Sequence, residues 1–278
     1  MIGKVLLPLD GSEASLKAFI PAKSIAELLG LNLCILYVSD EVLTQEELIK
    51  KLNIKTAELD SFMISQRSGV PETVIIEEGE KSDYIIMGTH GKTADETRRM
   101  GSTTAGVIEG TFKPIFLIKP DSYMNIINGK WVPHRALIPL NGAPGSAQAL
   151  APAVEILRKT TAKIELLHIC QSKAEPIKEE GGFTAPYYED YPQHEWASWS
   201  KEFIRRFSPV MENHNHINMS VSMAQGDPGD EIVTFAEKNN NDFIAIAWHG
   251  TMSQFRAMTL KKVLAESKCP IMLIKIKD

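Results

Sequence analysis

Short apolar runs and helical patterns alternate along this chain. The runs Lys4–Leu9, Asn32–Val38 and Tyr84–Met87 are rich in Val, Ile and Leu and show no apolar–polar alternation. Such runs are typical of strands that are buried on both faces of a parallel sheet. The segment between the first two runs predicts a helix with Ser12 as its N-cap and Gly30 just after its end.

The second half of the chain repeats the first. Three apolar segments recur in the same order, in the pairs Val5–Gly11 and Ala136–Gly142, Asp83–Met87 and Asp242–Ile246, and Pro114–Ile118 and Pro270–Ile274. The repeat also predicts a helix from Gly145 to Lys159 and a strand at Lys163–Ile169. About 26 extra residues fall in the middle of the second half, in the region 171–216. A repeat on this scale predicts two copies of one structural unit.

Strands that alternate with helices pair in parallel through right-handed crossovers. We therefore expect an α/β protein with two tandem doubly wound domains, residues 1–120 and 134–278. The joint between them holds Pro120, Asn128-Gly129 and Pro133, which are turn and breaker signals. In the extra region, four aromatic residues at helical spacing favour a helix packed on the sheet: Trp196, Trp199, Phe203 and Phe207.

Composition and charge then exclude several classes of protein. Thirty Lys and Arg against 35 Asp and Glu leave a formal net charge of −5, without the basic excess of a nucleic-acid-binding protein. No uncharged apolar run approaches the roughly 18 residues of a membrane span, and the N-terminus shows no signal-peptide layout. Cys34, Cys170 and Cys269 lie far apart in apolar segments, as reduced core cysteines do. We expect a cytoplasmic protein.

One segment carries candidate chemistry: Gly88-Thr89-His90-Gly91, nine further residues, and Gly101-Ser102-Thr103. Glycines let the backbone approach an anion closely, and a helix that opens at Gly101 points its free N–H groups at whatever lies there. In a doubly wound sheet the ligand crevice lies at the carboxyl ends of the strands, where the strand order reverses. If the first and fourth strands are neighbours, Asp10 and Gly88 face one crevice.

The spacing of these glycines, with Pro8-Leu9-Asp10-Gly11 upstream, resembles the universal stress protein family. The resemblance covers essentially the whole chain. It implies in each domain a five-stranded parallel sheet in the order 3-2-1-4-5, with helices on both faces. Members with the full glycine motif typically bind ATP, so the resemblance implies ATP, with or without Mg²⁺, in the first domain. The implied binding residues are Pro8, Leu9, Asp10, Val38, Met87, Gly88, His90, Gly91, Gly101, Ser102 and Thr103.

The resemblance also divides these residues among the parts of the nucleotide. It places the adenine near Asp10 and Val38, the ribose near Met87, Gly88 and His90, and the phosphates at Gly91, Gly101, Ser102 and Thr103. Two roles stay open for each of two residues. His90 either contacts the ribose or caps the loop, and Asp10 can instead cap the helix that follows it. Arg98 and Arg99 fit solvated surface better than a phosphate clamp.

The second half departs from the family pattern. It keeps Trp248-His249-Gly250 but has no Gly-Ser pair at its last helix, where Met258–Lys261 are bulky, and Asn141 replaces Asp10. We expect no ATP in this half. The first half is short between residues 39 and 68, so its second helix is expected as a stub near Gln45–Leu52, followed by the third strand.

These observations predict a regulatory protein that binds ATP in its first domain, with a second domain that is structural or binds an unidentified protein. The alternatives are an interaction protein without nucleotide and a slow ATPase. No catalytic residue stands out, so no efficient enzyme is expected. His214 and His216 lack a third ligand nearby, so we expect no metal.

The last strand of each half, Ile115–Ile118 and Ile271–Ile276, would leave an exposed sheet edge. In the family such edges pair antiparallel across a dimer. The resemblance therefore implies that the two halves pair with each other as an intramolecular pseudo-dimer. Whether whole chains form a homodimer stays open.

Overall fold

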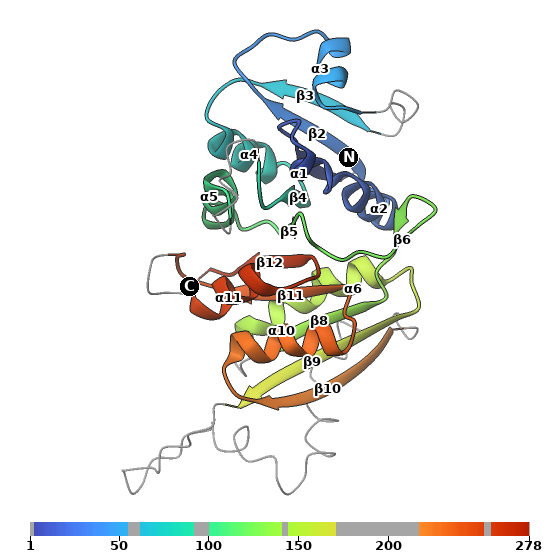
Figure 1. Ribbon diagram of the computed structural model, residues 1–278, viewed down its shortest axis with the longest axis vertical. Coiled ribbons are helices and arrows are strands. Elements are labelled where there is room, and N and C mark those ends of the chain that lie inside the picture. Colours follow the sequence, from blue (N-terminus) through green and yellow to red (C-terminus); the bar gives the residue numbers. More distant parts are fainter. Residues whose placement is uncertain are drawn as a thin grey trace, which may run out of the picture.

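The computed structural model describes residues 3–54, 62–91, 100–140, 144–170, 217–252 and 257–277. Ten strands form one sheet in the order β10-β9-β8-β11-β12-β5-β4-β1-β2-β3, and a two-stranded hairpin joins the halves (Figure 1). The helix expected around the aromatic residues at 196–207 lies outside the described residues.

The described elements of the first half are β1 (Lys4–Pro8), α1 (Glu13–Leu16), α2 (Phe19–Leu29), β2 (Asn32–Val38), α3 (Gln45–Lys51), β3 (Met63–Arg67), α4 (Pro71–Glu80), β4 (Tyr84–Gly88), α5 (Ser102–Gly110) and β5 (Ile115–Ile118). The hairpin has the strands β6 (Ile126–Ile127) and β7 (Lys130–Trp131). The second half adds β8 (Arg135–Leu140), the 3-10 helix η2 (Pro144–Ala149), α6 (Leu150–Leu157), β9 (Ala162–Cys170), β10 (Ile217–Gln225), α10 (Pro228–Lys238), β11 (Phe243–Trp248), α11 (Met258–Glu266) and β12 (Ile271–Lys275).

Each half has the strand order that was predicted. β1 pairs in parallel with β2 and β4, and β8 pairs in parallel with β9 and β11, so both halves read 3-2-1-4-5. The tandem doubly wound α/β fold is therefore confirmed. The strand bounds that the apolar runs gave are correct to within one residue, and the short second helix is α3.

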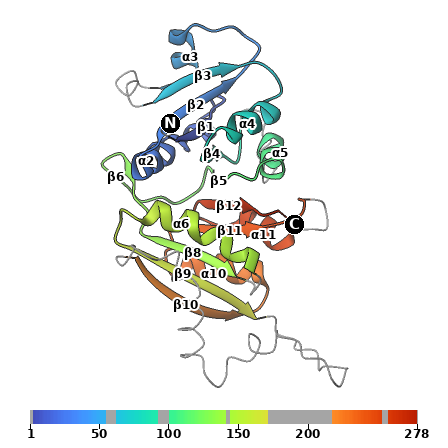
Figure 2. The same ribbon diagram turned by 180° about the vertical axis from the view of Figure 1, so that it is seen from behind.

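Helices cover both faces of the sheet, and each face has its own core. On one face α2, α6 and the hairpin pack on the strands, whereas α4, α5, α10 and α11 pack on the other (Figures 1 and 2). Cys34 and Cys269 are buried free thiols, as expected. The described helices include none that is long and apolar enough to cross a membrane.

Two helices differ from the prediction. The helix expected between Ser12 and Gly30 is broken into α1 and α2. The break places Pro21 in the first turn of α2, where its missing N–H removes no helical hydrogen bond. In the second half, the helix expected from Gly145 starts as the 3-10 helix η2 and becomes α-helical only in α6.

The two halves are joined edge to edge. β5 pairs antiparallel with β12, with Leu117 opposite Ile271 and Ile115 opposite Leu273. These side chains are almost completely buried. The pairing that the exposed edges predicted is confirmed, and it makes one continuous sheet of the two halves.

The hairpin between the halves adds a contact that the turn signals did not reveal. Asn128 and Gly129 form its turn with positive φ angles of 52° and 73°. The turn returns the chain so that Trp131 is 1% exposed, with its ring centroid 5.5 Å from that of Phe116 and 6.4 Å from that of Phe243. One aromatic side chain thus packs against both halves.

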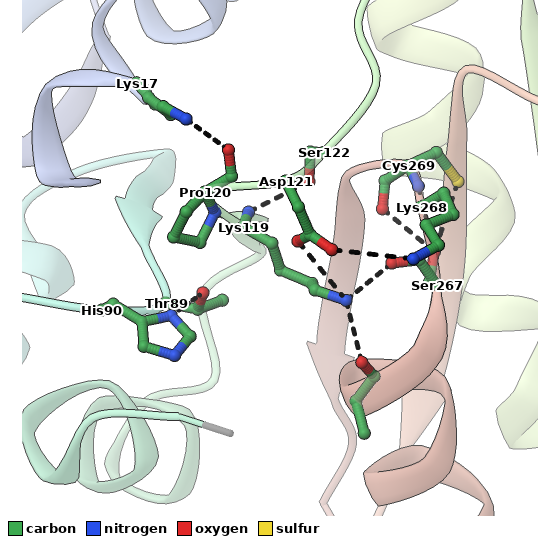
Figure 3. Close-up of polar contacts among 11 residues, drawn as sticks. Lys17, Thr89, His90, Lys119, Pro120, Asp121, Ser122, Ser267, Lys268 and Cys269 are labelled. Carbon is green, nitrogen blue, oxygen red and sulfur yellow. Dashed lines mark hydrogen bonds and ion pairs between the residues drawn. The ribbon is translucent and has the colours of Figure 1, made fainter. Parts of the chain in front are cut away.

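Two lysines at equivalent positions also bridge the halves. Lys119 follows β5, and its Nζ donates to the carbonyl oxygens of Ala265 (2.9 Å) and Ser267 (2.7 Å) at the end of α11 (Figure 3). Lys275 ends β12, and its Nζ donates to the carbonyl oxygen of Glu109 near the end of α5. Each half therefore caps the last helix of the other with a positive charge. Burial lowers the pKa of the Lys119 ammonium.

The strand pairing predicts that a charge at Leu117 destabilises the whole chain. An aspartate there would be buried without a partner, so Leu117→Asp should cost at least about 3 kcal/mol of unfolding free energy, measured by urea denaturation. Val42→Asp is the control, because Val42 is 97% exposed and its replacement should change stability by less than about 0.5 kcal/mol. Equal stability of the two variants would contradict the pairing.

The lysine caps predict unequal losses. Lys119→Met keeps the length of the side chain but leaves one buried and one partly buried carbonyl group without their donor, so we expect a loss of about 1–3 kcal/mol in the same assay. Lys275→Met should cost less, because Lys275 is only partly buried and bonds to one carbonyl oxygen. A larger loss at Lys275 than at Lys119 would refute this assignment.

Candidate functional site

All eleven predicted binding residues line one cavity of about 280 Å³. They come from four segments of the first half: the ends of β1 and β2, the end of β4 with the loop after it, and the start of α5. β1 and β4 are parallel neighbours, as the crevice argument required. The cavity therefore lies at the carboxyl ends of the strands, beside the point where the strand order reverses.

Asp10 enters the cavity just after β1. Its Oδ1 accepts hydrogen bonds from the Ser12 backbone N–H (2.9 Å) and from the Ser12 hydroxyl (2.7 Å). Ser12 in turn caps α1, because its Oγ accepts from the Ser15 N–H at 3.1 Å. Asp10 thus holds Ser12, the residue that caps α1, and is not itself the N-cap. Of the two roles open to Asp10, helix capping is excluded and ligand contact remains.

Two glycines differ in why they need no side chain. A Cβ at Gly88 would lie 3.2 Å from both the Ala14 carbonyl oxygen and the Ser15 Cα, so a side chain there would push the backbone of α1 by a few tenths of an ångström and the packing of α1 favours glycine. Among the described residues, a Cβ at Gly101 would meet only the Thr89 carbonyl oxygen, at 3.5 Å, and the φ of Gly101 is an ordinary −68°. The local fold therefore does not require glycine at position 101. Because Gly101 has no side chain, space stays open there beside the cavity.

Hydrogen bonds hold the loop after β4 at both of its described ends. The Thr89 N–H donates to the Ile118 carbonyl oxygen (3.0 Å), and the Gly101 N–H donates to the Thr89 carbonyl oxygen (2.9 Å). The Thr104 hydroxyl, within α5, donates to the Gly88 carbonyl oxygen at 3.2 Å. Strand β5 and helix α5 thus fix the position of this loop relative to the cavity.

The electrostatics of the cavity come from α5 and from Asp10. Gly101 is the N-cap of α5 and has no side chain to bond the first N–H groups of the helix, which carry the positive end of its dipole. Among the described lining residues Asp10 carries the one formal charge at neutral pH, and none is Lys or Arg. Arg98 and Arg99 lie outside the described residues.

The described part of the second half has a different arrangement. Its strand register sets Ala247 where the first half has Gly88, and Trp248 where it has Thr89. The residue before α11 is Ala257, whose φ is 53°, so the backbone enters α11 by a different path from that into α5. Met258 starts α11 and is 63% exposed. Asn141, the counterpart of Asp10, is not among the described residues.

Five further residues line the cavity and were not predicted: Ser15, Leu36, Pro71, Ile75 and Thr104. Leu36 lies opposite Pro8 in the strand register, and Thr104 directly follows the predicted Ser102-Thr103. Both could therefore have been predicted as lining residues from their position beside predicted ones. Pro71 and Ile75 lie on α4, and nothing in the local sequence indicates that this helix reaches the cavity. Among the described residues, no group of three His, Cys, Asp or Glu could hold a metal ion.

Comparisons with known proteins point to one family. The model of the universal stress protein family matches residues 1–119 and 133–275. Universal stress protein MJ0531 of Methanocaldococcus jannaschii is 33% identical over 139 residues, which cover 42% of this chain and 81% of that protein. The crystal structure of a universal stress protein from Archaeoglobus fulgidus superposes with a TM-score of 0.65 at 19% identity, covers 98% of each chain, and shares the fold.

Because Gly88 and Gly101 have different surroundings, replacing each by alanine should lower the unfolding free energy by different amounts. Gly88→Ala forces backbone atoms of α1 to move and should cost about 2 kcal/mol of unfolding free energy. Gly101→Ala should cost less than about 1 kcal/mol, the usual difference between Gly and Ala at an N-cap. Urea denaturation of both variants measures the two losses. The reverse order would show that Gly101, and not Gly88, is the structural glycine.

Proposed function

Because the chain belongs to the universal stress protein family, we propose that its first domain, residues 1–120, binds an adenine nucleotide, with ATP as the expected ligand. In this proposal the nucleotide favours one conformation of the chain, and an unidentified protein partner binds that conformation. The second domain, residues 134–278, is structural or contacts the partner. We also propose, from the sequence, that the chain acts in the cytoplasm.

The meeting of the eleven predicted residues around one cavity carries this proposal. Parallel pairing by itself brings the ends of β1 and β2 to this edge of the sheet, but a glycine loop that serves only as a turn gives no reason for the uncapped start of α5 to face the same space. Here Pro8 and Val38 share that space with Gly91 and Ser102, which follow them by more than fifty residues in the chain. A ligand that contacts all four segments accounts for the arrangement.

The lining suits the parts of a nucleotide. Leu36, Val38 and Met87 offer an apolar surface for a base. The Asp10 carboxylate accepts hydrogen bonds from an amine or a ribose hydroxyl, and the N-terminus of α5, with the hydroxyls of Ser102 and Thr103, suits phosphate oxygens. The volume of about 280 Å³ is just below the usual range of roughly 300–1,000 Å³ for ligand sites.

The second domain supports a different role. Ala247 adds a methyl group where a glycine would let the backbone approach a ligand, and Ala257 directs the chain differently into α11. Met258 replaces the hydroxyl that Ser102 offers. The strands of this domain nevertheless keep the full order and cover the edge of β5. A structural or partner-binding role fits these features better than a second nucleotide site.

The nucleotide proposal predicts that the purified full chain releases an adenine nucleotide when it is denatured, detected by mass spectrometry. Added ATP–Mg²⁺ should also raise its melting temperature, because a ligand that binds only the folded state at about 100 times its Kd adds roughly 2.7 kcal/mol of stability. A chain that releases no nucleotide and whose melting temperature ATP–Mg²⁺ does not change would overturn the proposal in favour of an interaction protein without nucleotide.

A pair of equivalent threonines gives the matched control for this test. Thr103 on α5 lines the cavity, and Thr259 holds the same helical position on α11. Thr103→Val removes a hydroxyl and should raise the Kd for ATP–Mg²⁺ by about fivefold to tenfold, measured by calorimetry. Thr259→Val makes the same chemical change in the second domain and should leave the Kd unchanged. Equal effects would place the nucleotide elsewhere.

A further inference from the structure

Thr89 and His90 form a hydrogen-bonded pair directly after β4. Thr89 is 2% exposed, and its Oγ1 lies 2.9 Å from Nδ1 of His90. The other ring nitrogen, Nε2, points away from Thr89 (Figure 3). His90 lines the cavity, and Thr89 is not among the described residues that do so. Thr89 therefore acts on the cavity through its neighbour.

The position of the hydroxyl proton decides the state of the imidazole. A hydroxyl buried as deeply as that of Thr89 needs an acceptor for its own proton. Within the described part of the chain, the partner of this hydroxyl is Nδ1 of His90. If Nδ1 carried the ring proton and donated it to Oγ1, the hydroxyl proton would lack an acceptor, at a cost of about 1–3 kcal/mol. The hydroxyl is therefore the donor, and a neutral His90 carries its proton on Nε2.

Backbone hydrogen bonds hold Thr89, and with it this hydroxyl, in a fixed position. Its N–H donates to the Ile118 carbonyl oxygen in β5, and its carbonyl oxygen accepts from the Gly101 N–H before α5. Both elements are packed in the core, so the backbone of Thr89 is held in place beside the histidine. A side chain held by a rigid neighbour loses less conformational entropy when a ligand binds.

We propose that Thr89 is a positioning residue whose hydroxyl donates to Nδ1 of His90 and so presents the Nε2–H of His90 as a hydrogen-bond donor to the ligand. The inference rests on the proposed nucleotide site and adds to it the direction of one hydrogen bond. In the complex the Nε2–H of His90 then donates to an acceptor atom of the nucleotide, such as a ribose or phosphate oxygen. Of the two roles open to His90, this assigns ligand contact and not capping of the loop.

The second domain contains the natural comparison. Trp248 stands at the position of Thr89 and is followed by His249 and Gly250, as Thr89 is followed by His90 and Gly91. Tryptophan has no hydroxyl, and the face of the Trp248 ring is instead 5.5 Å from the Nζ of Lys275. The device that sets the proton of His90 is thus missing from the domain for which we propose no nucleotide.

Nuclear magnetic resonance of the ligand-free, ¹⁵N-labelled full chain at pH 8 tests the assignment directly. Two-bond ¹H–¹⁵N correlations show which imidazole nitrogen carries the proton, and His90→Gln identifies the signals of His90. We expect an unprotonated Nδ1 whose resonance shifts in Thr89→Val and stays in place in Thr89→Ser. A protonated Nδ1, or a resonance that Thr89→Val does not shift, overturns the inference.

Calorimetry with ATP–Mg²⁺ tests the consequence for binding. Thr89→Val should raise the Kd by about tenfold, and Thr89→Ser should restore it to within about twofold of the wild type. In a His90→Ala background, Thr89→Val should have no further effect, because the hydroxyl acts through the imidazole. The same tenfold loss in that background would mean that Thr89 acts through the fold, and would overturn the inference.

The two measurements separate this inference from the proposal on which it rests. If the wild-type chain does not bind ATP–Mg²⁺, the nucleotide proposal fails, and with it the role of His90 as a donor to that ligand. The resonance experiment needs no ligand and still decides whether Thr89 sets the proton of His90. If ATP–Mg²⁺ binds but the resonance result is negative, the nucleotide proposal stands and the inference about Thr89 is refuted.

Discussion

The antiparallel pairing of β5 with β12 is the contact on which the rest of the structure depends. Each strand ends its own half and would otherwise expose a row of unpaired N–H and C=O groups. The pairing covers both edges and brings Lys119 and Lys275 within reach of the last helix of the opposite half. β5 also accepts the Thr89 N–H at Ile118, so the strand that joins the halves anchors the loop beside the cavity.

The two halves show that the scaffold and the site can change independently. Both keep the strand order, because buried apolar runs and sheet edges impose the same packing on each. The second half nevertheless has Ala247 for Gly88 and a left-handed Ala257 before α11. These changes fall at the carboxyl end of a strand and just before a helix, where they alter what the crevice can hold without disturbing the core.

The residues of the candidate cavity were largely predictable, in part from local rules and in part from the resemblance to the family, which implied Val38 and Met87. Strand ends, glycine spacing and a helix start can each be recognised in the sequence. They lie together at the carboxyl edge of the sheet because the strands pair in parallel. Pro71 and Ile75 were missed because α4 reaches the cavity through the packing of a crossover helix, which no short pattern records. Trp131 was missed as a core residue for a similar reason, since turn signals surround it.

The sequence by itself located most strands of the large sheet, the duplication and the glycine loop, because each can be recognised from short segments of the chain. Through the family resemblance it also implied the strand order. The bounds of β3 and β10 came only from the structure. Only the tertiary structure decided that Lys119 and Lys275 exchange helix caps. These contacts join residues more than 140 positions apart and exist only because the two halves of the sheet meet edge to edge.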